Sequence, residues 1–336
     1  MIYQSLFSHQ ASLPSEQLPF TVILLNDWGL IRVTGKDRVK YLQGQITLDV
    51  PLLKENQHIL GAHCDPKGKI LSTVRLFHYL KGLAFIARKS LLNDELMELR
   101  KYAVFSKVEI EIAESTVLLG IAGDQARKVL KNCFEKLPTE TEPVVHEDDY
   151  SLLHFSSPRE RFLLVSQTFK EGDFLIQKLQ DQAVFRSSEQ WLALDIESGF
   201  PIIEAKNKTQ FIPQAANLKV LGGISFTKGC YTGQEVVART EYRGVNKKAL
   251  YWLTGKACRV PDVGEDLEIQ MGEDYRRTGV VLAAVKLQDG SLWVQAILNH
   301  DFQKDSILRV KGDENGRLMI SHRSFKKFEP SSNPIA

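Results

Sequence analysis

The chain has 336 residues, a formal net charge of +2 at pH 7, 43% hydrophobic residues and 25% charged residues. This composition is typical of a globular protein and excludes the disordered and fibrous classes, and the length predicts two or three packed units. A charge so close to neutral gives no strong basic field, which argues against strong direct binding to nucleic acid.

The N-terminal residues and the cysteines narrow the choice further. The N-terminus lacks the basic start and apolar run of a secretory signal, and no stretch reaches the ~18 to 20 apolar residues that span a bilayer. We therefore expect a cytoplasmic protein that does not enter a membrane. The cysteines Cys64, Cys133, Cys230 and Cys258 lie far apart without a Cys-x-x-Cys pair, which argues against a disulfide framework and a structural zinc site.

The first two-thirds of the chain alternates predicted strands and helices. It starts with a polar stretch, residues 1–20, that we expect to be loosely held. Trp28 is expected at a turn around Asn26-Asp27, Ser90 is expected to cap a helix, and residues 138–149 are expected to form a charged linker. The predicted strands are 21–25, 30–33, 58–64, 70–77, 83–87, 107–112, 117–122, 152–155 and 161–165, and the predicted helices are 36–45, 90–103, 124–132 and 170–179.

The remaining part of the chain predicts one more helix and then a change of pattern. Residues 188–198 are predicted to form a helix that ends at Gly199, since glycine suits the left-handed conformation just past a helix. Beyond residue 245, short apolar segments alternate with turn residues, as in a small antiparallel β-barrel with strands at 250–253, 267–270, 277–287, 292–298, 307–310 and 318–321. We therefore predict an α+β fold, with an α+β region of two subdomains over 1–244, a barrel over 245–326 and a frayed tail over 327–336.

The segment Lys228-Gly229-Cys230-Tyr231-Thr232-Gly233-Gln234-Glu235 places a cysteine between two glycines and close to a lysine. Thr232 and Glu235 have the spacing of a capping box, so a helix is predicted to begin here. The positive end of that helix and the Lys228 ammonium would favour the thiolate of Cys230, the form that acts as a nucleophile or metal ligand. A small residue in a tight structural turn explains the same pattern equally well. The candidate catalytic residues are Lys228, Cys230, Gln234 and Glu235.

This octapeptide resembles the Lys-Gly-Cys-Tyr/Phe-x-Gly-Gln-Glu signature of the YgfZ family, folate-binding relatives of the glycine-cleavage T-protein that are associated with tRNA modification. The resemblance covers nearly the whole chain and implies a T-protein-like folate-binding core, with tetrahydrofolate or a one-carbon derivative as cofactor. It also implies iron–sulfur tRNA-modifying enzymes as partners. The other matching segments are Tyr41-Leu42-Gln43-Gly44-Gln45, Ala62-His63-Cys64-Asp65, Lys101-Tyr102-Ala103-Val104-Phe105-Ser106-Lys107, Gln190-Trp191-Leu192-Ala193-Leu194 and Phe211-Ile212-Pro213-Gln214-Ala215.

The resemblance also implies cofactor-binding residues. A folate presents a flat pterin ring that stacks on aromatic side chains and an amino edge that bonds to a carboxylate. Trp28 and Trp191 match positions associated with folate binding in the family, and Glu197 is similar to the T-protein glutamate that holds the pterin. Without the resemblance, packing of the tryptophans and solvent exposure of the glutamate are the commoner explanations.

Two further segments limit the chemistry. Where T-proteins carry adjacent aspartates, one of which assists one-carbon transfer, the corresponding residues here are Ser72 and Thr73. Without a carboxylate the proton-transfer step has no agent, so the T-protein reaction is not expected. His63 and Cys64 are neighbours on a predicted strand and point to opposite faces, so no metal site is expected there.

Our first hypothesis is a folate-binding accessory protein rather than a stand-alone enzyme. In it, Cys230 engages an iron–sulfur cluster, a persulfide or a partner thiol and supports the enzymes that thiolate tRNA. The second hypothesis is a folate-dependent one-carbon transferase of the aminomethyl type, with the thiol as nucleophile or acceptor. An RNA-binding module is a third hypothesis, which the near-neutral charge disfavours.

Overall fold

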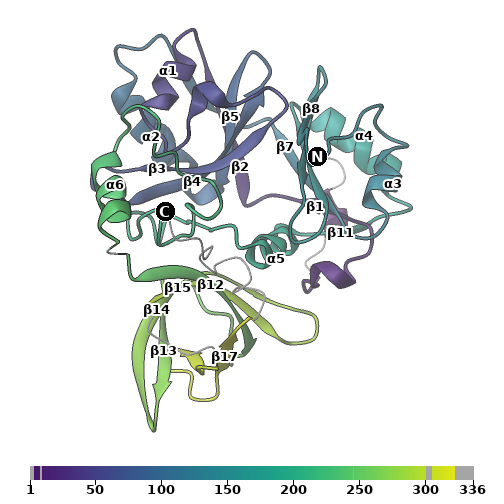
Figure 1. The fold of residues 1–336 in the computed structure, drawn as a ribbon. Coiled ribbons are helices and arrows are strands. Elements are labelled where there is room, and N and C mark those ends of the chain that lie inside the picture. Colours follow the sequence, from purple (N-terminus) through teal and green to yellow (C-terminus); the bar gives the residue numbers. More distant parts are fainter. Residues whose placement is uncertain (1–3, 8–9, 245, 300–304, 322–336) are drawn as a thin grey trace, which may run out of the picture.

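The structure, a computed structural model, describes residues 4–7, 10–244, 246–299 and 305–321, and its strands form two open sheets and a closed barrel (Figure 1). The two sheets lie side by side with the barrel below them in this view. The predicted α+β fold with a C-terminal barrel is confirmed. The predicted tail, 327–336, lies outside the described residues. Among the residues described, no helix combines the length and the apolar character needed to span a bilayer.

The first sheet and two helices come from one continuous part of the chain. They are β2 (Trp28–Thr34), α1 (Arg38–Gln43), β3 (His58–Cys64), β4 (Ile70–Tyr79), β5 (Gly82–Arg88), α2 (Leu92–Tyr102) and β6 (Glu109–Ile112). The strands pair antiparallel in the order β3-β4-β5-β2-β6. Because β4 alternates buried and half-buried side chains, its sequence carries the two-residue period that made it predictable.

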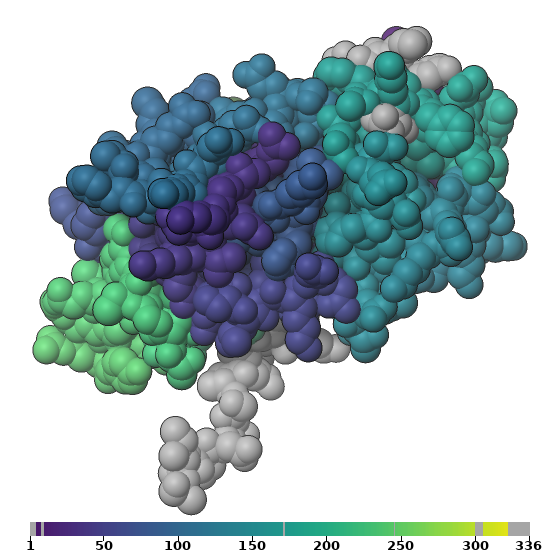
Figure 2. Space-filling view, turned by 90° about the horizontal axis from the view of Figure 1, so that it is seen from above, coloured from purple at the N-terminus to yellow at the C-terminus, as the bar shows by residue number. Residues whose placement is uncertain are grey.

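The second sheet joins one early strand to strands that follow the first sheet in sequence. Its elements and the helices beside it are β1 (Thr21–Leu24), β7 (Val117–Ala122), α3 (Ala126–Leu130), β8 (Val144–His146), β9 (Tyr150–Phe155), β10 (Arg161–Ser166), α4 (Phe169–Leu179), β11 (Val184–Arg186) and α5 (Ser188–Ser198). The order is β11-β1-β7-β10-β9-β8, with β1 and β11 parallel. Seen from above, the blue residues of the first sheet and the teal residues of the second form two adjacent lobes (Figure 2).

The strand predictions failed at three places in this region. β1 and β2 belong to different sheets, so Asn26-Asp27 is a crossover, and Trp28 is the first residue of β2 rather than a turn residue. β8 lies inside the predicted linker and β11 was not predicted at all. Each of these two strands has three residues, which is too short for an alternating pattern to be visible.

The C-terminal barrel follows one more helix. These elements are α6 (Gln234–Arg243), β12 (Lys248–Lys256), β13 (Asp266–Met271), β14 (Asp274–Lys286), β15 (Leu292–Asn299), β16 (Leu308–Val310) and β17 (Arg317–Ile320). The strands close in the order β12-β15-β14-β13-β16-β17, so every predicted barrel strand is confirmed. Closure pairs both edges of the sheet and leaves no open strand for association.

Helix α5 lies where the two sheets and the barrel meet. Trp191 and Leu194 pack into a core shared by both sheets, whereas Ala193 and Ile196 pack against Trp252 and Trp293 of the barrel. Buried contacts on opposite sides hold the helix at a fixed position between the units. The predicted end of this helix is confirmed, because Gly199 adopts a positive φ of 73°.

The N-terminal segment is held more firmly than its polar sequence suggests. The backbone N–H and carbonyl of Leu13 both bond to the Gln190 side-chain amide, each at 2.8 Å. Leu18 and Phe20 are buried. The expectation of a loose lead-in is therefore wrong for residues 10–20, since their partners lie far away in sequence on α5.

The two predicted helix caps are also wrong. The Ser90 hydroxyl bonds to the carboxylate of Glu204, and α2 begins after a single 3-10 turn without a side-chain cap. The residue that precedes α6 is Gly233, whose φ of 83° places it in the left-handed region, and no side chain caps this helix. Glu235 instead pairs with Arg239, one turn further along α6.

Candidate functional site

A cavity of about 50 Å³ lies between the two sheets, beside α5. Trp28 reaches it from the start of β2 and Trp191 from α5, so the fold brings together two predicted site residues that are far apart in sequence. Trp191 is 3% exposed, whereas Trp28 is half-buried. The other lining residues are Leu25, Leu60, Thr73, Arg75, Ile86, Ala87, Arg88, Phe155, Leu163, Asp195, Phe200, Pro201 and Ile202.

Each tryptophan carries a guanidinium group over its ring. The Cζ atom of Arg88 lies 4.0 Å from the ring centroid of Trp28, and that of Arg161 lies 4.2 Å from the ring centroid of Trp191. Phe155 meets Trp191 edge-on, with the ring centroids 5.6 Å apart. Cation–π contacts are stronger when buried, so the contact with Arg161 stabilises the buried Trp191 ring more than the contact with Arg88 stabilises the half-buried Trp28 ring.

The cavity holds more hydrogen-bond donors than acceptors. Among the described residues that line it, Asp195 supplies the carboxylate, and this accepts a bond of 2.6 Å from the buried Arg161. The Nη1 atom of the lining residue Arg88 is buried and has no hydrogen-bond partner. Burial lowers the pKa of Arg75 to about 10, which leaves this lining guanidinium charged at neutral pH. Acceptor atoms of a ligand would therefore be well matched to this site.

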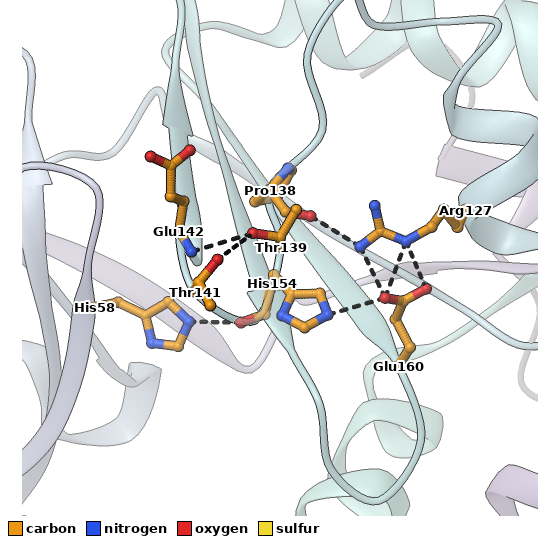
Figure 3. A network of polar contacts seen from close by, with 8 residues as sticks. All are labelled: His58, Arg127, Pro138, Thr139, Thr141, Glu142, His154 and Glu160. Atoms are coloured by element: carbon orange, nitrogen blue, oxygen red, sulfur yellow. Dashed lines mark hydrogen bonds and ion pairs between the residues drawn. The ribbon is translucent and has the colours of Figure 1, made fainter.

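A hydrogen-bonded network that runs from Arg127 to His58 (Figure 3) ends at Arg75, which lines the cavity. Arg127 forks around the carboxylate of Glu160, which also bonds Nε2 of His154 at 3.0 Å. The His154 carbonyl faces Nε2 of His58 at 2.7 Å, and Nδ1 of His58 faces Nη1 of Arg75 at 3.1 Å. Since a carbonyl can only accept and a guanidinium can only donate, Nε2 of His58 carries the proton and Nδ1 accepts. His58 is thus neutral and joins the two sheets.

The neutral state of His58 predicts a pH-dependent stability. Burial, with the nearby charge of Arg75, lowers the pKa of His58 to about 3, whereas an unfolded histidine titrates near ~6.5. The unfolded state therefore takes up a proton that the folded state refuses, so this contribution is complete above the unfolded pKa and is lost as the pH falls. Between about pH 7 and about pH 5 the parent should lose about 2 kcal/mol more unfolding free energy than His58→Gln. Urea titrations at both values measure this, and equal losses would contradict it.

The predicted reactive cysteine lies on a loop outside the cavity wall. Cys230 is exposed, and the loop around it reaches across to the end of α1, where the Thr232 N–H donates to the Gly44 carbonyl at 3.1 Å. A Cβ atom at Gly233 would lie 2.4 Å from the Asp65 carbonyl, so only glycine allows this close approach. The loop is therefore docked on the first sheet while its thiol faces solvent.

The chain and its barrel match known proteins. Residues 246–313 match the family model "YgfZ, beta-barrel domain". The chain is 98% identical over 336 residues to the "tRNA-modifying protein YgfZ" of Hamiltonella defensa subsp. Acyrthosiphon pisum (strain 5AT), with 100% of both chains covered. It is 57% identical over 320 residues to the "tRNA-modifying protein YgfZ" of Yersinia pestis (strain Pestoides F), covering 95% of this chain and 97% of the relative. The chain belongs to the YgfZ family.

The fold of this YgfZ-family chain is also found in a T-protein. The crystal structure of glycine cleavage system aminomethyltransferase T from Bartonella henselae superposes with a TM-score of 0.68 at 15% identity. The match covers 92% of this chain and 86% of that one. The T-protein-like fold predicted from the resemblance is confirmed.

Glu197 lies away from the cavity. Its carboxylate accepts the Ser15 N–H at 3.1 Å and the Ser15 hydroxyl at 2.9 Å, and it is not among the lining residues. On a helix, residues four apart share a face, so Asp195 lies on the face of Trp191 and Glu197 does not. Asp195 is the acidic residue of α5 that lines the cavity, which the sequence analysis did not name, and its four-residue spacing from Trp191 was the available signal.

Ser72 and Thr73, which the resemblance places where T-proteins carry aspartates, are buried or have a structural partner. Thr73 lines the cavity and donates its hydroxyl to the Pro201 carbonyl at 3.2 Å, while Ser72 is fully buried. Neither Ser72 nor Thr73 offers a carboxylate to the cavity.

His63, which was not expected to form a metal site with Cys64, makes a buried 2.9 Å contact with Glu95.

Lys228 of the YgfZ signature holds the loop in place. Its ammonium donates to the carbonyls of Gln43, Ile46 and Leu48 at 2.7, 2.7 and 2.6 Å, and it is 7% exposed. Burial lowers the pKa of Lys228 to about 8. An ammonium has three N–H donors and all three are used, so Lys228 has none left for Cys230. Lys228 therefore has a structural role, and its expected electrostatic effect on the Cys230 thiolate stays a prediction.

The two other signature residues have local partners. The Gln234 side-chain oxygen accepts the Tyr231 N–H at 3.1 Å, which fixes the turn between Cys230 and α6. Glu235 is exposed and bonds to Arg239. Neither contact adds a charged group next to the thiol.

Replacing Lys228 by methionine should destabilise the protein strongly. The substitution keeps the apolar stem and leaves three buried carbonyls without a donor, at about 1 to 3 kcal/mol each. We expect the unfolding free energy to fall by about 3 kcal/mol or more, measured by denaturant titration. Lys219→Met, which removes an exposed ion pair with Glu241, is the control and should cost less than about 1 kcal/mol. Similar losses in the two variants would contradict the proposed anchor.

Proposed function

We propose that this YgfZ-family protein binds a folate in the cavity between Trp28 and Trp191 and supports tRNA modification through the exposed thiol of Cys230. The observation that carries the proposal is the convergence of the two tryptophans on one cavity, since the resemblance had associated both positions with folate. The curated relatives at 98% and 57% identity are named as tRNA-modifying proteins, which supports the second half.

The lining residues fit a pterin chemically. Aromatic rings supply stacking surfaces, the unpartnered Nη1 atom of Arg88 suits its carbonyl and ring-nitrogen acceptors, and Asp195 can accept from its amino edge. We therefore propose Trp28, Trp191 and Asp195, with Asp195 in the place first given to Glu197. A volume of about 50 Å³ holds one or two waters, so a pterin enters only if half-buried side chains such as Trp28 and Arg88 move aside.

Cys230 is proposed to act on a partner rather than on the folate alone. An exposed thiol on a docked loop is accessible to an iron–sulfur cluster, a persulfide or a thiol of another protein. The proposed partners are the iron–sulfur enzymes that thiolate tRNA. The alternative, a one-carbon transferase, lacks support, because Asp195 is engaged by Arg161 and Thr73 provides no carboxylate.

Calorimetry with tetrahydrofolate tests the cavity. The parent should bind, and Trp28→Ala should bind about tenfold more weakly, because a stacking surface of about 1 kcal/mol and its apolar contact are lost. Tyr242→Ala removes an exposed aromatic ring on α6 and should leave the affinity unchanged. Absence of binding by the parent, or equal binding by Trp28→Ala, would remove the folate from this cavity. Turnover of a one-carbon folate by the purified protein would favour the transferase.

A further inference from the structure

The second half of α2 and the loop that connects it to β6 expose large apolar side chains, with Met97 and Tyr102 on the helix and Val104 and Phe105 on the loop. Phe105 is fully exposed at 100%, Val104 at 75%, Met97 at 58% and Tyr102 at 49%. Single exposed apolar residues are common on protein surfaces, but a concentration within nine residues of sequence marks an interaction site. We call these four residues the loop patch. It includes Tyr102, Val104 and Phe105 of the Lys101–Lys107 segment, for which neither the cavity nor Cys230 gives a reason.

The exposure of the loop patch does not come from an unstructured loop. The Ser106 N–H donates to the Ala103 carbonyl at 2.8 Å, which closes a turn with Phe105 near its tip. The Lys107 N–H donates to Oδ2 of Asp37 at 2.8 Å, and the Asp37 N–H donates to the Lys107 carbonyl at 3.3 Å. The base of the loop is thus clamped to the turn that precedes α1. A surface held in one shape loses little conformational entropy when a partner binds.

Lysines lie beside the loop residues Val104 and Phe105, whereas Met97 shares a pocket with three acidic side chains and Lys208. Lys36, Lys101 and Lys107 are exposed, and Gly35 contacts the Lys107 backbone so closely that a Cβ atom there would lie 2.2 Å from its carbonyl. Lys101 is paired with Glu98, whereas Lys36 and Lys107 have no ion pair within the described part of the chain. The one nearby carboxylate on the clamping turn, Asp37, accepts from the Lys107 backbone. The apolar tip is therefore flanked by uncompensated positive charge.

We propose that the loop patch docks an acidic partner protein. Phe105 and Val104 would enter an apolar pocket of that protein, and Lys36 and Lys107 would pair with carboxylates at its rim. An apolar centre with a charged rim is the usual organisation of a protein interface, in which the centre provides affinity and the rim provides orientation. Docking at this loop requires neither the cavity nor the thiol, so the inference goes beyond the proposed function.

RNA is a less suitable partner for the loop patch than an acidic protein. Bases stack on aromatic rings, but Val104 and Met97 are aliphatic and offer no stacking surface. Binding to phosphates grows with each cation that neutralises one, and two unpaired lysines would give only a weak, salt-sensitive contact. The composition of the patch therefore favours a protein.

The test places a photoreactive benzoylphenylalanine at position 105 of the full-length chain in cells, and at Phe174 on α4 in the control. Phe174 is 67% exposed, so both changes leave the fold intact, which thermal unfolding verifies. We expect a protein adduct at 105 that is absent at 174 and that falls several-fold with Lys36→Glu and Lys107→Glu together. An adduct with RNA, an adduct with a second copy of this chain, no adduct, or one unaffected by the charge reversal would each overturn the proposal.

A second measurement separates this proposal from the proposed function. Phe105→Ser and Cys230→Ser are compared for tRNA thiolation in cells that lack the parent gene. A loss in the Phe105→Ser strain, together with the charge-dependent adduct, supports docking of a protein that acts in tRNA modification. If Cys230→Ser has no effect while the charge-dependent adduct persists, the thiol role fails and docking stands.

Discussion

Replacing Cys230 by serine should abolish the support of tRNA thiolation while the fold and the folate affinity stay unchanged. The side chain is exposed and a hydroxyl occupies nearly the same volume, so the unfolding free energy should change by less than about 0.5 kcal/mol. The thiol chemistry, in contrast, is lost completely. Thiolated nucleosides of tRNA from cells lacking the parent gene give the readout, and denaturant titration and calorimetry verify the fold and the cofactor site.

Cys258 is the matched control, because it is the other exposed cysteine among the described residues. A hydrogen bond to the Asp313 carboxylate, and its negative charge, raise the pKa of the Cys258 thiol. Burial raises the pKa of Cys64 and of Cys133. Alkylation at neutral pH should therefore mark Cys230 first, and Cys258→Ser should complement fully. Full complementation by Cys230→Ser, or equal loss in both variants, would show that the thiol of Cys230 has no special role.

Replacing Trp191 by alanine should lower the unfolding free energy by about 3 to 5 kcal/mol, as is usual for a large aromatic side chain in a core. The ring is 3% exposed and fills the space beside Gly120, where a Cβ atom would lie 2.4 Å from its Cε3 atom. It also covers the guanidinium of Arg161, which the substitution would leave buried without its ring. Urea titration measures the loss.

Because Trp191→Ala should lose so much unfolding free energy, Trp28 is the better position at which to measure the contribution of a tryptophan to ligand binding. Weaker folate binding by Trp191→Ala would combine a missing stacking surface with a loosened core, whereas Trp28 is half-buried and its loss should cost clearly less stability. A Trp191→Ala variant that is as stable as Trp28→Ala would mean that Trp191 contributes to ligand binding alone.

Much of the fold could be predicted because its signals are local. β3 and β7 were predicted with their actual bounds, and each of the barrel strands was found, since alternating apolar residues and turn residues lie next to each other in the chain. The end of α5 at Gly199 likewise depends on one residue and its left-handed conformation. The family could be recognised from a short signature for the same reason.

The composition of the candidate site depends on contacts between segments that are distant in sequence, so only the tertiary structure showed which residues line the cavity. The sequence could nominate Trp28 and Trp191, but only the packing of two sheets on α5 places both at one cavity. The spacing from Trp191 already favoured Asp195 as the acid on the cavity side, but the partner of Glu197, Ser15, lies 182 positions away and could not be predicted from the sequence.

Lys228 shows most clearly the difference between what the sequence predicted and what the tertiary structure determined. In the sequence it lies two residues before Cys230, which suggested an electrostatic role. Its partners in space are carbonyls 180 to 185 positions away, which take all three of its donors. Local sequence determined the strands, the helix end and the exposed thiol motif, whereas the hydrogen-bond partners of buried polar groups were decided by the tertiary structure, because those groups are satisfied wherever the fold brings a donor and an acceptor together.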